Sequence, residues 1–581
     1  MIKLKNKLQN LSNFFTNFFK IIEKNNKKKF YYTIILNFFA AILEFFTIAL
    51  IVPIIILLLK KEPLVQLGPL TSVFNSFNKV GFNEQLIFFL VAINILFFLR
   101  FIFTLYINKY KITFLNEVFV DISTKVFISN VLNDYELLIR KTTPGIVKNI
   151  YFESDLFVKN IVTTIVNFFF EIFKILAILL ILLFIDPISL IGGSIFFGLF
   201  SVMFLGFYKS KITSWGDSQI KSYEKMIQFI NEGFQSIKEI KMIKNKNFFP
   251  EKFTFYVKNF VNAKINKEIT NSIPRPLYEL LFIILITVVI LYYSLSIKDI
   301  SEAAVVLGIF AVGFVRLLPS VMKLLNDFQN IFYSLNSVQI IRKNIEDYKD
   351  LNERNTRIQN YNLQKNIDKI ELQNVSYYYE KGKNETIKDF SYIFEKNKIY
   401  GIFGKSGSGK TTLVSLIMGL LKPTNGKIFI NKNEIENSIE LIQNNISYLP
   451  QKIFLINDTI KKNIAFGIND SEIDDGKALK ALEMSNLKEI LKEKKNNLNF
   501  VISEYGKNLS EGQKQRLGFS RIIYDSKQII VLDEFTSALD YQNEDILLKN
   551  IKSIKKDKII LIVSHKNEIK NICDEIITLG N

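Results

Sequence analysis

The sequence predicts an α-helical transmembrane domain of six spans, followed by an α/β domain of the P-loop NTPase class. The chain has 581 residues, too many for a single hydrophobic core. Apolar residues make up 49% of it, and most of its 54 phenylalanines precede position 340. The C-terminal third carries a glycine-rich loop between a strand pattern and a helix pattern. We therefore expect a transmembrane domain at 1–345, a linker at 346–365 and an α/β domain at 366–581.

The N-terminal segment alternates basic and apolar residues near helical spacing over positions 1–29. This pattern predicts an elbow helix lying on the cytoplasmic face of a membrane. A signal peptide is the alternative, but Asn13, Asn17 and Lys20 interrupt the apolar stretch.

Six apolar runs are long enough to cross a membrane. They occupy about 30–59, 86–107, 161–185, 188–208, 277–297 and 303–325. The long connections after the second and fourth spans are rich in lysine, which places them and both termini in the cytoplasm. These connections contain few helix breakers, so we expect spans two to five to continue as helices beyond the membrane. Between the first two spans, residues 67–80 predict a short amphipathic helix on the outer face.

The C-terminal domain alternates strand and helix patterns. Residues 370–375, 398–403 and 528–532 predict strands, and residues 411–420 predict the helix after the glycine-rich loop. This alternation is typical of an α/β domain with a parallel core.

The composition also limits the partners of the chain. A net charge of +19 could indicate nucleic-acid binding, but basic loops beside membrane spans explain it more simply. We therefore expect no nucleic-acid partner. The one cysteine, Cys573, excludes an intramolecular disulfide.

The glycine-rich loop follows a buried-strand pattern and precedes a helix, the arrangement in which backbone N–H groups bind phosphates. We expect Lys410 to reach the β- and γ-phosphates and Thr411 to bind Mg²⁺. A merely structural turn is the alternative. The predicted nucleotide-binding residues here are Gly404, Lys405, Ser406, Gly407, Ser408, Gly409, Lys410, Thr411 and Thr412.

Further motifs follow the loop in one order: Gln451, the run 509–513, the pair Asp533 and Glu534, and His565. Together with the loop they resemble the ATP-binding cassette (ABC) family. The resemblance implies ATP and Mg²⁺ as cofactors, and ATP hydrolysis coupled to transport across a membrane.

The resemblance assigns roles to these side chains. Asp533 and Gln451 would bind Mg²⁺ together with Thr411. Glu534 would polarise the attacking water, and His565, the single histidine of the chain, would contact the γ-phosphate. A structural histidine is the alternative for that position.

Two further sites follow from the same resemblance. Tyr379 stands where the family stacks an aromatic ring on adenine, although Tyr377 or Tyr378 could serve instead. The run 509–516 resembles the signature sequence, whose Ser510, Gly512 and Gln513 would face the ATP of a partner subunit. Glu511 replaces the usual glycine, and we expect its side chain to point away from the phosphates.

The position of the signature implies a dimer, because each ATP lies between two cassettes. All matched catalytic positions look intact, which favours a homodimer; a heterodimer with a second half-transporter is the alternative. Residues 502–506 resemble the loop that exporters place before the signature, and the fusion of both domains in one chain also favours an exporter. Helices near 133–143 and 231–241 would connect the spans to the cassette.

Charged residues within the spans allow two interpretations of the cargo. They are Glu44, Arg100, Glu171, Lys174, Arg275, Glu279, Arg316 and Lys323. In the first interpretation they form salt bridges that pack helices, such as Glu171 with Lys174. In the second, Arg100, Arg275, Arg316 and Lys323 form a basic cavity for an anionic head group.

The membrane half resembles the bacterial lipid-linked oligosaccharide flippases of the PglK type. The resemblance rests on Pro274-Arg275 with Glu279, on the run 316–320, on the run 98–100, and on Glu44 before Pro53. It implies outward flipping of a polyprenyl-pyrophosphate glycan across a bacterial inner membrane, for glycosylation or surface polysaccharide. The alternatives are an exporter of another lipid, a peptide or a drug, and, more remotely, a soluble cassette ATPase.

Overall fold

The computed structural model describes residues 16–60, 81–183, 187–295, 300–358, 366–379, 386–435, 439–489 and 498–580. The predicted outer-face helix at 67–80 lies outside these ranges, as do residues 1–15 of the predicted elbow helix. The chain divides into two compact units, Met1–Asn133 with Leu138–Glu353, and Asp134–Leu137 with Arg354–Asn581.

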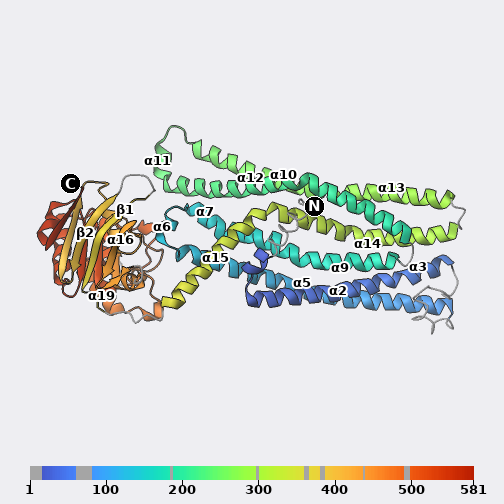
Figure 1. Cartoon of the computed structure of the whole chain (residues 1–581), viewed down its shortest axis with the longest axis horizontal. Helices are drawn as coiled ribbons and strands as arrows, with labels where there is room; N and C mark the ends of the chain where they lie inside the picture. The colour runs from blue at the N-terminus through green and yellow to red at the C-terminus, as the bar shows by residue number, and fades with distance from the viewer. Residues whose placement is uncertain are drawn as a thin grey trace. The chain divides into compact units, whose positions relative to one another are not determined.

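The first unit is entirely helical in its described part (Figure 1). Its long helices are α2 (Lys24–Ala49), α3 (Ile51–Lys60), α5 (Phe82–Val131), α9 (Thr163–Leu183), α10 (Pro187–Gln235), α12 (Phe248–Ser272), α13 (Pro274–Leu295), α14 (Ile300–Tyr333) and α15 (Leu335–Ile358). Its short elements are α7 (Thr143–Val147), α8 (Ser154–Leu156) and α11 (Ile237–Met242), with π-helical turns η3 (Lys148–Glu153) and η4 (Phe157–Val162). The short α6 (Tyr135–Leu138), which follows α5, belongs mostly to the second unit.

Five helices within the described ranges are long and apolar enough to cross a membrane. They are Lys24–Ala49, Phe82–Val131, Thr143–Leu183, Leu190–Gln235 and Phe248–Val288. The sixth predicted span lies within α14. With 50 and 49 residues, α5 and α10 are far longer than the roughly 20 residues that a bilayer requires. The expectation of helices that continue beyond the membrane therefore holds for both.

The helices of the first unit pack through close backbone contact and apolar side chains. α2 packs against α9 and α5, while α10 runs beside α12 and against α14 (Figure 1). A Cβ atom on Gly216 of α10 would lie 2.0 Å from the carbonyl oxygen of Tyr333, so this crossing requires glycine. Phe18, Phe30, Phe114 and Phe157 belong to a buried cluster that joins the N-terminal helical turn to α2, α5 and η4.

The second unit contains two sheets. The antiparallel sheet has the order β2 (Ile387–Glu395), β1 (Lys369–Tyr377), β4 (Asn425–Ile430) and β5 (Asn433–Glu434). The parallel sheet has the order β6 (Ile446–Leu449), β7 (Ile529–Asp533), β8 (Ile559–Val563), β3 (Lys398–Gly404) and β9 (Glu575–Leu579). The predicted α/β class and its parallel core are thus confirmed.

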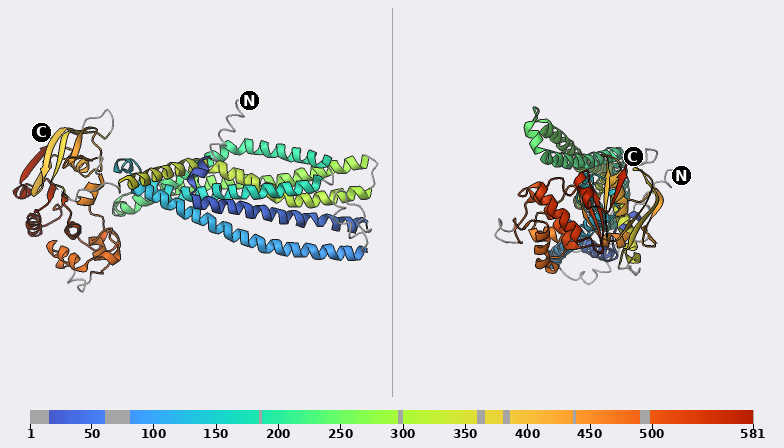
Figure 2. Two further views of the ribbon diagram at one scale, coloured as in Figure 1. Left: turned by 60° about the horizontal axis from the view of Figure 1, so that its bottom comes forward. Right: turned by 90° about the vertical axis from the view of Figure 1, so that its left-hand side faces the viewer.

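Helices and helical turns complete the second unit. They are α16 (Lys410–Ile417), α17 (Ile439–Asn445), α18 (Ile460–Ile464), η6 (Asp470–Glu472), α19 (Asp475–Met484), η7 (Glu504–Gly506), α21 (Glu511–Asp525), α22 (Tyr541–Ser553) and η8 (Asn567–Ile572). β7 and β8 are buried along their whole length, as expected for central parallel strands with both faces covered. Figure 2 shows the sheets of this unit from two further directions.

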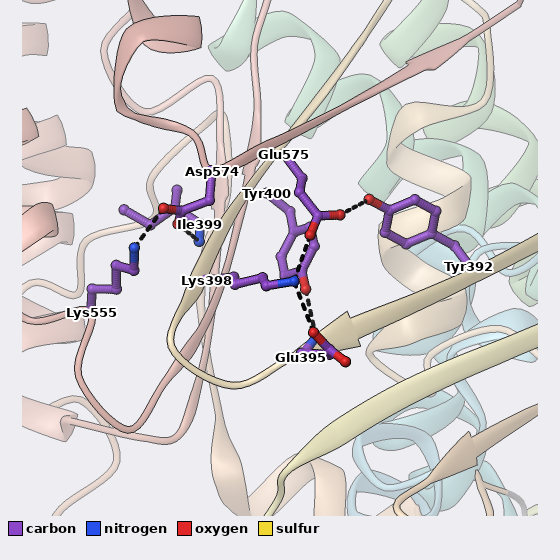
Figure 3. Close-up of polar contacts among 8 residues, drawn as sticks. All are labelled: Tyr392, Glu395, Lys398, Ile399, Tyr400, Lys555, Asp574 and Glu575. Atoms are coloured by element: carbon purple, nitrogen blue, oxygen red, sulfur yellow. Dashed lines mark hydrogen bonds and ion pairs between the residues drawn. The ribbon is translucent and has the colours of Figure 1, made fainter.

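A network of charged groups joins the two sheets at the start of β3 (Figure 3). Lys398 Nζ lies 2.8 Å from Glu395 Oε2 on β2 and 2.7 Å from Glu575 Oε1 on β9. The Tyr392 hydroxyl donates to the same Glu575 carboxylate, and both contacts lower the pKa of Glu575. Because β2 and β9 belong to different sheets, these contacts fix the sheets against each other.

Candidate functional site

The glycine-rich loop connects β3 to α16, as predicted. Gly404, Gly407 and Gly409 all have positive φ angles, of +153°, +81° and +92°. A Cβ atom on Gly409 would also lie 2.7 Å from the carbonyl oxygen of Thr386. The loop thus adopts a backbone conformation that L-residues rarely take, with its N–H groups next to the N-terminus of a helix.

Lys410 begins α16 and is only 7% exposed. Its Nζ donates hydrogen bonds of 2.9 Å to the carbonyl oxygens of Gly404 and Lys405. The Ser408 hydroxyl is buried and has no hydrogen-bond partner within the described part of the chain. The Lys410 ammonium group bound to its own loop, together with the unpaired Ser408 hydroxyl, fits a binding site for a chain of phosphates.

The two adjacent carboxylates stand at the carboxyl end of β7. Asp533 is the last residue of this strand, and Glu534 follows with a φ of +48°. The Glu534 N–H donates to the carbonyl oxygen of Val563 at 3.0 Å, which holds this unusual backbone conformation against β8. The two side chains therefore leave the strand in different directions, with Asp533 7% exposed and Glu534 24% exposed.

Glu534 meets both other predicted catalytic residues. Gln451, which follows β6, donates from Nε2 to Glu534 Oε2 at 2.5 Å. His565, which follows β8, places Nε2 at 3.4 Å from Glu534 Oε1. The loops after three neighbouring parallel strands thus bring the three side chains together at one edge of the sheet.

Burial raises the pKa of Asp533, and the neighbouring carboxylate of Glu534 raises it further. Lys410 and His565 act in the opposite direction. A cation that neutralised both carboxylates would remove this repulsion.

The residues fit a magnesium ion. The Thr411 hydroxyl, the Asp533 carboxylate and the Gln451 amide oxygen, which would hold the ion, are oxygen donors of the kind that Mg²⁺ prefers. This fit is supported by the surroundings of Asp533, which is buried beside the carboxylate of Glu534 and has a raised pKa.

Tyr379 is the most exposed of the three tyrosines considered for the adenine ring. It is 47% exposed, and its hydroxyl lies 3.1 Å from Thr412 Oγ1 on α16. Tyr377 is 2% exposed and packs in the domain core. The hydrogen bond to Thr412 places an exposed aromatic ring beside the first turn after the phosphate-binding loop.

The signature-like run forms the start of α21. Ser510 caps the helix: its hydroxyl accepts from the Gln513 N–H at 3.2 Å, and the Ser510 N–H donates to Gln513 Oε1 at 2.9 Å. Glu511 has a 76% exposed side chain and pairs with Lys514 at 2.8 Å. Its carboxylate is thus balanced by a lysine on the same helix, and its orientation toward a partner's ATP stays a prediction.

Gln515 lies within the predicted signature run, but the sequence assigned it no role of its own. Its Nε2 donates to Ser537 Oγ at 2.8 Å, and its Oε1 accepts from the Ala538 N–H at 3.0 Å. These bonds connect the signature helix to the loop after Glu534. Its partner Ser537 lies 22 residues away in the sequence, so no local pattern predicts these bonds.

The four basic residues predicted to line one cavity do not form one cluster. Arg100 forms an ion pair with Glu44, and Arg316 Nη1 lies 4.0 Å from the same carboxylate. Lys323 pairs with Glu171 at 2.9 Å, and Arg275 pairs with Glu279 at 3.1 Å on the surface of α13. Each of these cations thus has a carboxylate partner, and their role in binding an anionic head group stays a prediction. Lys174 also approaches Glu171, at 4.0 Å, as the packing interpretation expected.

A cavity of about 460 Å³ does lie in the first unit, between α9, α10, α13 and α14. Its lining is aliphatic and aromatic, with Phe197, Tyr278, Phe282 and Phe314 among the rings. None of the four basic residues lines it.

Comparisons with known proteins agree with the cassette motifs. Residues 387–537 match the protein family described as "ABC transporter". A "Probable ABC transporter ATP-binding/permease protein" of Haemophilus influenzae is 30% identical over 47% of this chain and 49% of its own. An "ATP-dependent lipid A-core flippase 2" of Colwellia psychrerythraea is 29% identical over 62% of this chain and 61% of its own. The chain thus spans between about half and three-fifths of the length of these curated relatives.

The fold extends the comparison over nearly the whole chain. A solved bacterial Atm1-family ABC exporter with ATP bound aligns with 96% of this chain and 94% of its own, with a TM-score of 0.72 and 15% sequence identity. At that identity the likeness concerns the fold alone. The second unit therefore combines the fold and the family match of an ABC ATP-binding domain, and the first has the helical fold of an exporter.

Proposed function

We propose that this chain is an ATP-driven half-transporter that moves an amphipathic lipid across a membrane. The observation that supports the proposal most strongly is the group of Gln451, Glu534 and His565 beside a phosphate-binding loop. This group stands in a chain whose other unit has helices long and apolar enough to cross a membrane.

The proposed hydrolysis uses the chain's own groups at defined atoms. Lys410 and the N–H groups of the loop bind the phosphates, and the exposed ring of Tyr379 stacks on the adenine. Glu534 accepts a hydrogen bond from the attacking water and receives its proton, while His565 contacts the γ-phosphate. Thr411, Asp533 and Gln451 would hold Mg²⁺, which supplies charge neutralisation at the phosphates.

A second copy of the chain completes this site in the proposal. The N-terminus of α21, with the N–H of Gly512 and the hydroxyl of Ser510, would face the γ-phosphate bound to the partner copy. A homodimer is the simplest assembly, since each predicted catalytic side chain is present; a heterodimer is the alternative.

The segments that connect the spans outside the membrane would couple ATP hydrolysis to transport. Asp134–Leu137, at the end of α5, belong to the same compact unit as the cassette. In that unit Lys422 Nζ lies 3.3 Å from Asp134 Oδ2. This grouping supports the role proposed for residues 133–143, and by analogy for residues 231–241.

The proposed cargo is a lipid with a phosphorylated head, specifically a polyprenyl-pyrophosphate oligosaccharide. The flippase relative is named for another lipid with a large polar head, which supports this class of cargo. Arg100 and Arg316 share one buried carboxylate and both lie over the Phe97 ring, at 5.7 and 5.5 Å. Two arginines on one carboxylate leave an excess positive charge for an anionic head. The proposed location is a bacterial inner membrane with both termini in the cytoplasm.

Stimulation of ATP hydrolysis distinguishes the candidate cargoes. The full chain in neutral lipid nanodiscs would be assayed with polyprenyl-pyrophosphate oligosaccharide, with a lipopolysaccharide-type lipid and with a hydrophobic peptide. The proposal expects the largest stimulation from the polyprenyl-linked glycan, and a reduced stimulation in Arg316→Ala with unchanged basal hydrolysis. Stimulation by the peptide alone would replace the lipid with a peptide cargo.

A further inference from the structure

A groove of about 750 Å³ lies at the N-terminal end of the first unit, between the turn that precedes α2 and the helix α15. It belongs neither to the nucleotide site nor to the proposed path of the cargo. Its lining residues are Thr16, Phe19, Lys20, Ile22, Glu23, Lys24, Lys27 and Lys349.

The groove has an excess of positive charge. Four lysines line it against one carboxylate, Glu23, and that carboxylate forms an ion pair with the buried Lys125 of α5. Among the described residues, Lys20, Lys24, Lys27 and Lys349 have no ion pair with a carboxylate; Lys349 Nζ instead donates to the carbonyl oxygen of Lys20 at 2.8 Å. Residues 1–22 contain no Asp or Glu, so the segment before the groove cannot neutralise it.

The lysines also occupy an unfavourable place on their helix. The first turn of α2 contains Lys24 and Lys27 and no acidic residue. Because the N-terminus of a helix carries partial positive charge, lysines there repel both the helix and one another. A bound anion would relieve this repulsion.

The sequence of α2 places the groove at the level of lipid head groups. The basic residues end at Lys29, and the apolar part of the span begins at Phe30. Tyr31 and Tyr32 follow with 53% and 42% exposure, as is typical of aromatic residues at a membrane interface. Basic clusters directly beside a span are typical binding sites for anionic lipids.

We propose that this groove binds the phosphate of an anionic phospholipid head group, held by Lys20, Lys24, Lys27 and Lys349. Because Lys349 belongs to α15, the bound lipid would join the start of α2 to the last helix before the cassette. The protein already joins α15 to the helical turn before α2, since Arg342 Nη1 donates to Asn17 Oδ1 at 2.9 Å.

The test compares lipid retention by native mass spectrometry of the full chain. The chain would be released from nanodiscs of phosphatidylcholine with or without phosphatidylglycerol. The variant K20Q/K24Q/K27Q/K349Q should lose the most tightly retained phosphatidylglycerol of each chain. Retention should persist in the charge-preserving variant with arginine at the same four positions. The matched control K244Q/K246Q/K252Q/K258Q removes four charges on and before α12 and should retain the lipid.

Three results would overturn the proposal. They are equal retention in the native chain and the glutamine variant, an equal loss in the control variant, or a loss in the arginine variant as large as with glutamine. Inorganic phosphate separates the two possible sources of the anion. If millimolar phosphate displaces the retained lipid, the groove is a site for free anions and the assignment to a lipid head group fails.

Discussion

The two units use carboxylates in opposite ways. In the first unit, Glu44 is 2% exposed and lies between two arginines, Arg100 and Arg316. In the second, Glu534 is 24% exposed, and its side chain contacts the Gln451 amide and the His565 imidazole. Arginine stays charged at every relevant pH, so both partners of Glu44 are permanent cations. Glu534 is held by weaker partners that can be exchanged, as a general base requires.

The largest expected effect is that of removing the reactive carboxylate. Glu534→Gln should lower ATP hydrolysis by about 10²- to 10⁴-fold, because the amide cannot accept the proton of the attacking water. ATP binding should remain, since the phosphate-binding loop is untouched. Phosphate release and the binding of a fluorescent nucleotide measure the two quantities separately. Glu483→Gln, an exposed carboxylate of α19 paired with Lys488, serves as the control and should hydrolyse ATP normally.

Replacement of Glu44, the carboxylate between two arginines, should mainly lower the stability of the first unit. Glu44→Gln leaves two arginines in the span without their anion, which costs on the order of 3–5 kcal/mol of stability. Trp215 of α10 is the single tryptophan of the chain, so its fluorescence reports thermal unfolding of the first unit. Glu279→Gln breaks an exposed pair within one helix and should cost about 0.5 kcal/mol or less. Equal melting temperatures for the two variants would contradict the assignment of Glu44 as a structural anion.

The phosphate-binding loop allows a smaller, geometric test within the second unit. Gly409→Ala adds a Cβ atom against the Thr386 carbonyl oxygen at a φ of +92°, which should cost about 1–3 kcal/mol and weaken nucleotide binding. Gly407 has a φ of +81° but open space around it. Gly407→Ala should therefore cost less, about 1 kcal/mol. Nucleotide titrations of both variants check this order, and a weaker effect at Gly409 than at Gly407 would refute it.

The network between the sheets should give an effect of about 1 kcal/mol. Tyr392→Phe removes the hydroxyl that donates to Glu575 and leaves the ring packing intact. Chemical unfolding, followed by a nucleotide-binding probe of the second unit, measures this loss. Tyr541→Phe changes a 79% exposed tyrosine and should leave the unfolding midpoint where it is.

The smallest effect concerns the pH dependence of magnesium binding. The pKa of Asp533 is raised by burial and then by Glu534, so its carboxylate becomes protonated at a higher pH than an ordinary aspartate. Because Mg²⁺ requires the ionised form, Mg²⁺-dependent nucleotide binding should be lost on acidification above the usual aspartate range. Glu534→Gln removes the second cause and should move this loss to lower pH. An unchanged midpoint would show that burial alone sets the pKa.

Much of the second unit could be predicted because its signals are local in sequence. The strand before the loop, the loop itself and the acidic end of β7 are each read from fewer than ten consecutive residues. The contact of Gln451 and His565 with Glu534 depends on the order β6-β7-β8 of the sheet. That order was implied only by the family resemblance, and the Gln515 bonds were not implied by any motif.

The first unit was harder to predict because its charges find partners far along the chain. Glu44 meets Arg100 from α5 and Arg316 from α14, so no local pattern distinguishes a paired arginine from a free one. The boundary between the two units, at Glu353 and Arg354, falls within the predicted linker, but more than half of that segment is helical. Residues 346–358 lack an apolar stripe, yet they continue α15, whose buried Val338, Ile341 and Ile345 anchor the preceding turns. A helix once formed by packing propagates through polar residues at little cost.

The central claim is that hydrolysis at Glu534 drives the movement of a lipid through the first unit. The most direct test is ATP-dependent translocation of a polyprenyl-pyrophosphate oligosaccharide in proteoliposomes, with the native chain and Glu534→Gln reconstituted in parallel. The proposal predicts translocation by the native chain and none by the variant. Equal translocation by both, or none by a native chain that hydrolyses ATP normally, would contradict it.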